Sequence, residues 1–126
     1  MSAIDELLTE ARVRLERVFP DDLAGEMASG AVIVDMRPIT QRLRDGELPG
    51  AIVIDRNVLE WRLDPTCPHH IPEVSNTQAR IILVCNEGYG SSLAAATLQD
   101  LGLHRATDLI GGFQALARRA NRDLHE

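Results

Sequence analysis

The sequence predicts an α/β fold of three layers, with a mainly parallel central sheet and helices on both of its faces. Apolar runs rich in β-branched residues predict strands at 31–35, 51–55 and 81–84, and residues 106–110 are predicted as a last short strand. Helical patterns separate these runs, and strands that alternate with helices form parallel sheets. The runs at 31–35 and 81–84 are almost wholly apolar, as expected of strands buried on both faces. A length of 126 residues predicts a single domain over 1–126.

The first segment predicts a helix over 1–19 that packs on the core. Apolar residues recur at positions 4, 7, 8, 11, 15 and 18, which places them along one helical stripe. Ser2 is expected to cap this helix, while Arg14 and Arg17 lie near its predicted end. Pro20 stops the pattern and opens a short second helix over 23–27, which Gly30 ends.

In the middle of the chain, a predicted strand ends in two charged residues, and two irregular connections follow it. Asp35 and Arg37 stand where the strand at 31–35 ends, and we expect them to pair with each other or to cap local backbone. Residues 43–50 are rich in turn formers, and 56–62 predict a short helix or turn. Three prolines make 64–72 a loop. Its Cys67, His69 and His70 match no standard zinc spacing, so we predict neither a metal site nor a cofactor.

One stretch carries the features of a reactive site. Cys85 directly follows the strand at 81–84, and a short loop with two glycines leads to a helix predicted to begin at a serine cap, Ser91. Loop and helix-terminal amides point inward in such an arrangement, and the helix dipole adds partial positive charge. These donors favour the thiolate, which is the reactive form of cysteine.

The remaining elements complete the alternation. Residues 101–104 end that helix and turn toward the strand at 106–110. Gly111 and Gly112 then turn the chain into a last helix over 113–121.

Composition excludes several classes of partner. A net charge of −6 and a pI near 5.1 argue against nucleic acid and anionic membrane surfaces, which both favour a basic face. No apolar run approaches the roughly 20 residues of a membrane span. The acidic start at residues 1–6 lacks the features of a signal peptide. Two cysteines are too few for a disulfide framework, so we expect a cytoplasmic protein in a reducing compartment.

Five motifs give the chain a resemblance to the single-domain rhodaneses, a family of sulfurtransferases. They cover residues 17–120 and follow one another in the family's order. They are Asp35-Met36-Arg37 at a strand end, 46–51 as the Pro-Gly-Ala motif, Val84-Cys85 with Gly88 as the active-site loop, 91–96 as the following helix, and Gly111-Gly112-Phe113.

The resemblance implies a function for the central stretch. Cys85 would attack a sulfane sulfur, hold it as a persulfide and pass it to a thiol or protein acceptor. Backbone donors around that sulfur would come from the loop, and two glycines there allow φ > 0 and inward N–H groups. The residues that would surround the sulfur are Asn86, Glu87, Gly88, Tyr89, Gly90 and Ser91, although both Ser91 and Ser92 also fit a helix cap.

The sequence departs from the family's motifs at three positions. Gly90 stands where the family has its loop arginine, Glu47 replaces a histidine, and Leu116 replaces a late tryptophan. Loss of the loop cation, with Glu87 nearby, predicts weak use of thiosulfate and leaves a polysulfide or persulfide as the other small donors. Arg37, Arg56 or Arg62 could supply a cation from outside the loop.

Three alternatives to a sulfurtransferase follow from the same residues. A rhodanese-like module could bind a partner without catalysis. A redox protein could oxidise Cys85 and resolve it with Cys67, provided that their Cα atoms lie within about 7 Å. A phosphatase with a related cysteine loop is the weakest alternative, because those enzymes rely on a loop arginine and their loop is one residue longer.

Overall fold

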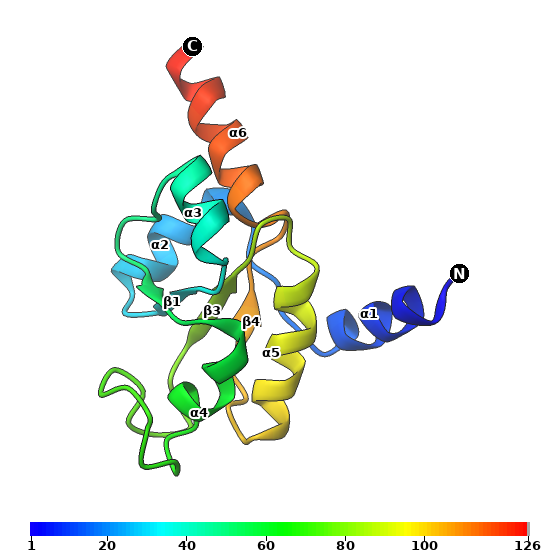
Figure 1. Cartoon of the computed structure of the whole chain (residues 1–126), viewed down its shortest axis with the longest axis vertical. Helices are drawn as coiled ribbons and strands as arrows, with labels where there is room; N and C mark the ends of the chain where they lie inside the picture. Colours follow the sequence, from blue (N-terminus) through cyan, green and yellow to red (C-terminus); the bar gives the residue numbers. More distant parts are fainter. Residues whose placement is uncertain (126) are drawn as a thin grey trace.

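The computed structural model describes residues 1–125 and has a four-stranded, fully parallel sheet at its centre (Figure 1). The strand order is β2-β1-β3-β4. The strands are β1 (Val32–Asp35), β2 (Ile52–Val53), β3 (Ile81–Val84) and β4 (Thr107–Asp108). Val34 of β1 is in register with Leu83 of β3 and with Ile52 of β2. The predicted parallel α/β sheet is therefore confirmed, although the two outer strands are shorter than the apolar runs that predicted them.

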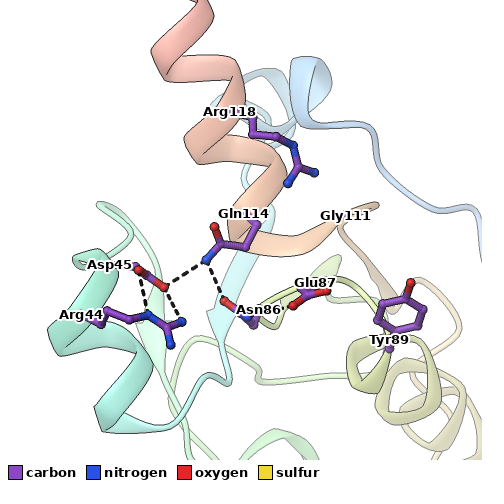
Figure 2. Close-up of a pocket in the computed structure, with 8 residues that line it drawn as sticks. All are labelled: Arg44, Asp45, Asn86, Glu87, Tyr89, Gly111, Gln114 and Arg118. Carbon is purple, nitrogen blue, oxygen red and sulfur yellow. Dashed lines mark hydrogen bonds and ion pairs between the residues drawn. The ribbon is translucent and has the colours of Figure 1, made fainter.

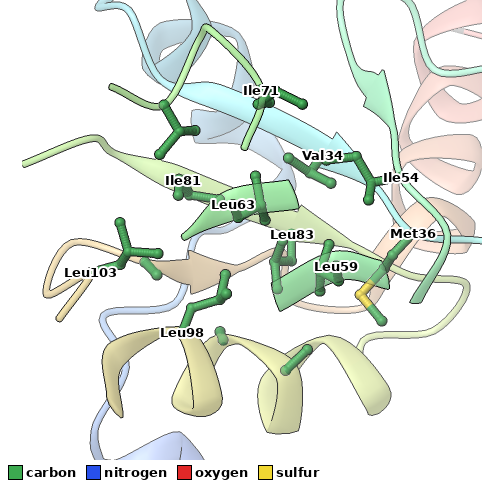
Figure 3. Close-up of a cluster of buried hydrophobic side chains, with 14 of the residues drawn as sticks. Val34, Met36, Ile54, Leu59, Leu63, Ile71, Ile81, Leu83, Leu98 and Leu103 are labelled. Atoms are coloured by element: carbon green, nitrogen blue, oxygen red, sulfur yellow. The ribbon is translucent and has the colours of Figure 1, made fainter. Parts of the chain in front are cut away.

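Helices connect the strands and cover both faces of the sheet. They are α1 (Ala3–Val13), α2 (Leu23–Ala28), α3 (Ile39–Asp45), α4 (Leu59–Leu63), α5 (Gly90–Asp100) and α6 (Gly112–His125), with 3₁₀ turns η1 (Pro20–Asp22) and η2 (Arg56–Val58). Alternate residues of β3 point to opposite faces, as a strand requires. Ile81 and Leu83 join the cluster that includes residues of α4 and α5 (Figure 3), whereas Ile82 and Val84 join the cluster that includes residues of α2 and α6.

The first helix is shorter than its apolar stripe predicts. Ser2 caps α1 in a capping box with Asp5, as expected, but the helix ends at Val13. Val18 instead pairs with the edge of the sheet next to β4: its amide donates to Asp108 O over 3.0 Å, and its carbonyl accepts from Ile110 N over 2.9 Å. The prediction of a helix through Val18 was wrong because a β-branched residue at this point gains two sheet hydrogen bonds.

Helix α1 packs on α5 and covers little of the core. Ala11 is its one buried residue, while Ile4 and Leu7 are 57% and 52% exposed. Figure 1 shows the N-terminal end of α1 projecting away from the sheet. The core-covering residues of the predicted 1–19 helix are Leu15 and Val18, which lie beyond its actual end.

Helix α3 differs from the prediction, because it includes residues 43–45, which the sequence predicts as part of a turn-rich connection. The helix starts after Pro38 and ends at Gly46, whose φ of +95° suits glycine at a helix end. Residues 64–72 are irregular, as expected, and in the described part of the chain no three His, Cys, Asp or Glu side chains gather as a metal site. No helix within residues 1–125 is long and apolar enough to span a membrane.

Candidate active site

The backbone at Cys85 is fixed between the end of β3 and the start of α6. The carbonyl of Cys85 accepts a hydrogen bond from Phe113 N over 2.9 Å, and the carbonyl of Asn86 accepts from Gln114 N over 3.0 Å. Gly112 allows this approach: it has φ +60°, and a Cβ atom on it would lie 2.7 Å from the carbonyl carbon of Asn86. The Gly-Gly turn therefore holds the cysteine against the N-terminus of α6.

The Cys85 sulfur is half-buried and has two polar neighbours. The amide of Gly88 donates to Sγ over 3.2 Å, and the thiol lies 3.2 Å from Ser91 Oγ. The amides of Glu87 and Tyr89 have no hydrogen-bond acceptor within residues 1–125. One loop N–H, that of Gly88, is thus already on the sulfur, and two further N–H groups of the loop have no acceptor in the described chain.

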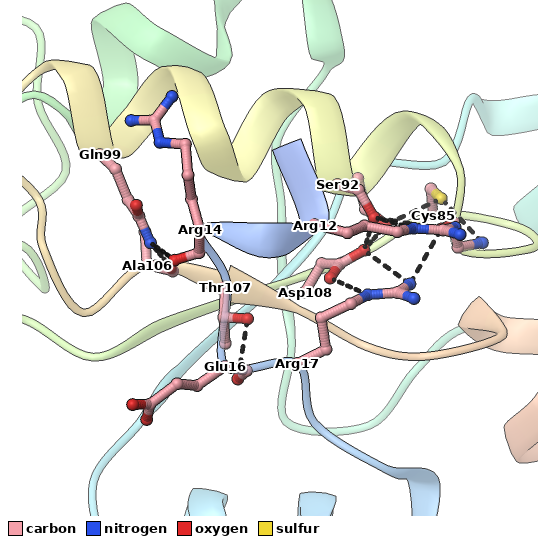
Figure 4. A network of polar contacts seen from close by, with 12 residues as sticks. Arg12, Arg14, Glu16, Arg17, Cys85, Ser92, Gln99, Ala106, Thr107 and Asp108 are labelled. Carbon is pink, nitrogen blue, oxygen red and sulfur yellow. Dashed lines mark hydrogen bonds and ion pairs between the residues drawn. The ribbon is translucent and has the colours of Figure 1, made fainter. Parts of the chain in front are cut away.

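Ser91 and Ser92 do not cap α5, which corrects the sequence-based expectation. Tyr89 occupies the N-cap position, without a side-chain cap, and both serines are fully buried. Their hydroxyls donate to the same carboxylate oxygen of Asp108, over 2.7 Å and 2.8 Å (Figure 4). Ser91 therefore connects the Cys85 thiol to a buried carboxylate.

Two arginines of the N-terminal segment contact the loop, and sequence reasoning missed both. Arg12 Nη2 and Arg17 Nη2 donate to the carbonyl oxygen of Gly88, over 2.7 Å and 3.0 Å. Arg17 also pairs with Asp108 over 2.8 Å, which balances that buried charge. These residues lie 76 and 71 positions from Gly88, so no local spacing could have indicated the contact.

Two adjoining cavities open on the loop. The first, of about 430 Å³, contains Cys85 and is lined further by Met36, Arg37, Pro38, Gln41, Asn86, Glu87, Tyr89 and Gly90. The second, of about 690 Å³, shares Asn86, Glu87 and Tyr89 with the first (Figure 2). A molecule bound at the sulfur therefore has room to extend past the loop.

The second cavity presents charges of both signs. Asp45 binds Arg44 over 2.7 Å, and this hydrogen bond holds the pKa of Asp45 below its usual value. Gln114 lies between Asp45 and Asn86 and donates to both over 3.0 Å. Arg118 has no ion-pair partner among the described residues. Among the described residues that line this cavity, Arg118 is thus the one cation without an ion-pair partner.

The other predicted site residues lie in different surroundings. Arg37 lines the Cys85 cavity, but it is 2% exposed, pairs with Asp35 over 2.7 Å, and stacks over Phe113. The expected Asp35–Arg37 pair is confirmed, and Arg37 Nη1 has no hydrogen-bond partner within residues 1–125. Arg56 does not line the cavity and pairs with Glu60 over 2.6 Å.

Arg62 and Cys67 also lie away from the Cys85 cavity. Arg62 donates to the carbonyl of His69 within the loop that follows α4. Cys67 is a free cysteine in the same loop. Figure 1 shows that loop at the lower end of the molecule, away from the start of α6, to which the Cys85 loop is bonded. The structure does not bring the two cysteines together at the cavity.

Solved structures with related folds include three informative neighbours. A protein of unknown function from Rhodopseudomonas palustris, described as a possible tyrosine phosphatase, is 33% identical, with a TM-score of 0.84 over 95% of this chain and 92% of that one. A rhodanese homologue from Thermus thermophilus is 27% identical, with a TM-score of 0.58 over 79% and 99% of the two chains. The human single-domain sulfurtransferase shares the fold at 21% identity, with a TM-score of 0.66 over 82% and 96%.

The sequence itself gives the family. A comparison with curated proteins finds no match. The family model for the rhodanese-like domain matches residues 19–119, which include all four strands and the Cys85 loop but not α1. The match covers most of the chain, and the fold has a parallel sheet in which a cysteine loop follows β3. The chain therefore belongs to the rhodanese-like domain family.

Proposed function

We propose that the protein is a sulfurtransferase that carries sulfane sulfur as a persulfide on Cys85. The observation that carries this proposal is the setting of the Cys85 sulfur. The sulfur lines an open cavity and accepts a hydrogen bond from the amide of Gly88 over 3.2 Å. The neighbouring amides of Glu87 and Tyr89 have no acceptor within the described residues. A nucleophilic thiolate and an anionic persulfide need the same donors, because both place negative charge on sulfur.

In the first step, the Cys85 thiolate attacks the outer sulfur of a donor R–S–SH. A bond forms between Sγ and that sulfur, the donor's S–S bond breaks, and R–S⁻ leaves with the electron pair. The terminal sulfur of the new persulfide extends into the cavity, where the free amides of Glu87 and Tyr89 can bind it. No external oxidant or reductant takes part.

In the second step, an acceptor thiolate attacks the terminal sulfur of the Cys85 persulfide. The new bond joins the acceptor to that sulfur, and the Cys85 thiolate is the leaving group, which the Gly88 amide stabilises. The acceptor is a small thiol or a cysteine of a partner protein, since the cavity is open to solvent at the exposed Glu87 and Tyr89.

Two features favour a persulfide or polysulfide donor over thiosulfate. Gly90 provides no side-chain cation inside the loop, whereas the sulfite that leaves from thiosulfate carries two negative charges. The second cavity of about 690 Å³ provides room for an organic group attached to the sulfur. Among the described residues, Arg37 is the one arginine that lines the Cys85 cavity, and Asp35 offsets its charge.

The intact mass of the purified protein tests the proposal directly. Incubation with a polysulfide should add the mass of one sulfur, and thiosulfate should add much less. The gain should disappear in Cys85→Ser and remain in Cys67→Ser, since Cys67 lies outside the cavity. An unmodified mass with every donor would instead support a binding module without catalysis.

The phosphatase description of the Rhodopseudomonas palustris neighbour applies to that protein. In this chain neither position 90 nor position 91 is arginine, and Ser91 is buried against Asp108. Phosphate transfer by a cysteine loop depends on guanidinium groups around the transferred phosphoryl group. The loop therefore fits sulfur transfer better than phosphate transfer.

A further inference from the structure

Residues 1–18 lie outside the matched family domain, yet two of their arginines contact the reactive loop. Arg12 and Arg17 donate to one backbone atom, the carbonyl oxygen of Gly88, over 2.7 Å and 3.0 Å. Neither guanidinium lines the Cys85 cavity. Both cations therefore contact the loop without lining the cavity.

Further contacts hold each arginine in place. Arg12 Nε donates to Ser92 Oγ over 3.1 Å, and its guanidinium lies over the Tyr89 ring, 5.5 Å from the centroid. Arg17 makes two bonds to the buried carboxylate of Asp108 (Figure 4). Each guanidinium is thus held by contacts beyond the one with Gly88, so the fold fixes the position of both cations at this carbonyl.

The peptide that joins Gly88 to Tyr89 transmits the effect. In a planar trans peptide the C=O and N–H groups point in opposite directions. The Gly88 carbonyl points to the arginines, so the N–H of Tyr89, a residue that lines the Cys85 cavity, points away from them. This N–H has no acceptor within the described chain. Two charged donors on the carbonyl polarise the peptide and make its N–H a stronger donor.

We propose that Arg12 and Arg17 are positioning residues that give the Cys85 cavity, through the Gly88–Tyr89 peptide, the positive polarisation that Gly90 cannot provide. This inference rests on the proposed sulfur transfer. The ligand class is an anion at the cavity, which in turnover is the terminal sulfur of the Cys85 persulfide. The arginines touch no reacting atom and exchange no proton or electron with it.

The test measures how well inorganic sulfate protects Cys85 from alkylation by iodoacetamide. All variants carry Cys67→Ser, so that Cys85 is the cysteine whose alkylation is measured. Arg12→Gln should raise the half-protecting sulfate concentration by about three- to tenfold and slow persulfide formation by a similar factor. Arg12→Lys keeps a charged donor and should recover most of both losses. Arg14→Gln is the matched control, because Arg14 follows α1 and its guanidinium pairs with the exposed Asp100.

Arg17→Lys provides a second variant that keeps a charge beside the buried Asp108 and so preserves folding. It should give an intermediate loss of sulfate protection. The inference is overturned if Arg12→Gln matches Arg14→Gln in both measurements, or if sulfate fails to protect the Cys67→Ser parent. Failure of the proposed function is a separate result: the parent would take up no sulfur, while sulfate protection would still depend on Arg12.

Discussion

A side chain on Gly88 would collide with the backbone of Gly111: a Cβ atom built on Gly88 would lie 2.7 Å from the amide nitrogen of Gly111. Gly88 also has φ +85°, a conformation that suits glycine alone among common residues. The reactive loop and the turn before α6 therefore pack backbone against backbone. This contact positions the amide that donates to the Cys85 sulfur.

Gly88→Ala should disrupt this packing and the amide position together. We expect a loss of about 1–3 kcal/mol in the free energy of unfolding and a loss of most persulfide formation. Gly90→Ala is the control within the same loop, since Gly90 has no positive φ and a Cβ there meets no atom within 4 Å. Urea unfolding and intact mass measure the two effects. Equal behaviour of the two variants would contradict the role of Gly88.

Gly90→Arg should increase sulfur uptake from thiosulfate. The open space at Gly90 accepts a side chain, and a guanidinium there would bind the two charges of the leaving sulfite. Charge-assisted hydrogen bonds stabilise by about 1.5–3 kcal/mol each, which corresponds to a gain of roughly ten- to a hundredfold. Gly90→Gln adds similar bulk without charge and should gain little. The rate of mass increase with thiosulfate gives the result.

Asp35→Asn should destabilise the fold far more than the removal of an exposed ion pair. Arg37 and Asp35 are fully buried, so the substitution leaves a guanidinium without its charge partner. We expect a cost of about 3–5 kcal/mol. Asp100→Asn removes the exposed pair with Arg14 and should cost less than about 1 kcal/mol. Urea denaturation of both variants compares them, and similar midpoints would refute the prediction.

Arg118→Gln should weaken the binding of donors that carry a carboxylate. Arg118 lines the second cavity beside the loop, where a carboxylate attached to a persulfide can reach it. An exposed pair of this kind stabilises by about 0.2–1 kcal/mol, which predicts a rise in KM of about 1.4- to fivefold. Inorganic polysulfide should be unaffected. Arg122→Gln, on the same helix but outside both cavities, serves as the control.

Stability should fall at low pH through the pair between Glu26 and Arg80. The hydrogen bond from Arg80 lowers the pKa of Glu26 below its ordinary value of 4.5, so the folded state favours the carboxylate. The pair's contribution, about 0.5–1 kcal/mol, is complete above pH 4.5 and is lost as the pH falls through the lowered value. Glu26→Gln should therefore be less stable than the parent at pH 7 and equally stable near pH 2. A difference that is the same at both pH values would exclude this linkage.

Local sequence patterns predicted the elements that depend on local physics. Continuous β-branched runs indicated β1 and β3, and the cysteine between a buried strand and a glycine loop indicated the reactive site. Motif order indicated the family. The Asp35–Arg37 pair followed from residues close together in sequence.

The missed features depend on contacts between distant segments. Ser91 looks like a helix cap in sequence, but Asp108, 17 positions away, accepts its hydroxyl instead. Arg12 and Arg17 lie in a segment that the sequence predicts to be one helix, and only the fold brings them to Gly88. Val18 continues the helical stripe, yet its backbone joins the sheet. In each case the contact that decides the structure is made with a residue too far away in sequence for a helical or strand period to indicate it.

The backbone of Val18 has a further consequence for the solution behaviour of the protein. Strand β4 would otherwise end the sheet with an unpaired row of polar groups, and such an edge is a template for pairing between chains. Val18 occupies that edge by accepting from Ile110 and donating to Asp108. A fragment that begins at the family-domain boundary, residue 19, would leave those groups uncovered. The segment before the domain thus pairs with polar groups at this edge that another chain could otherwise use for pairing.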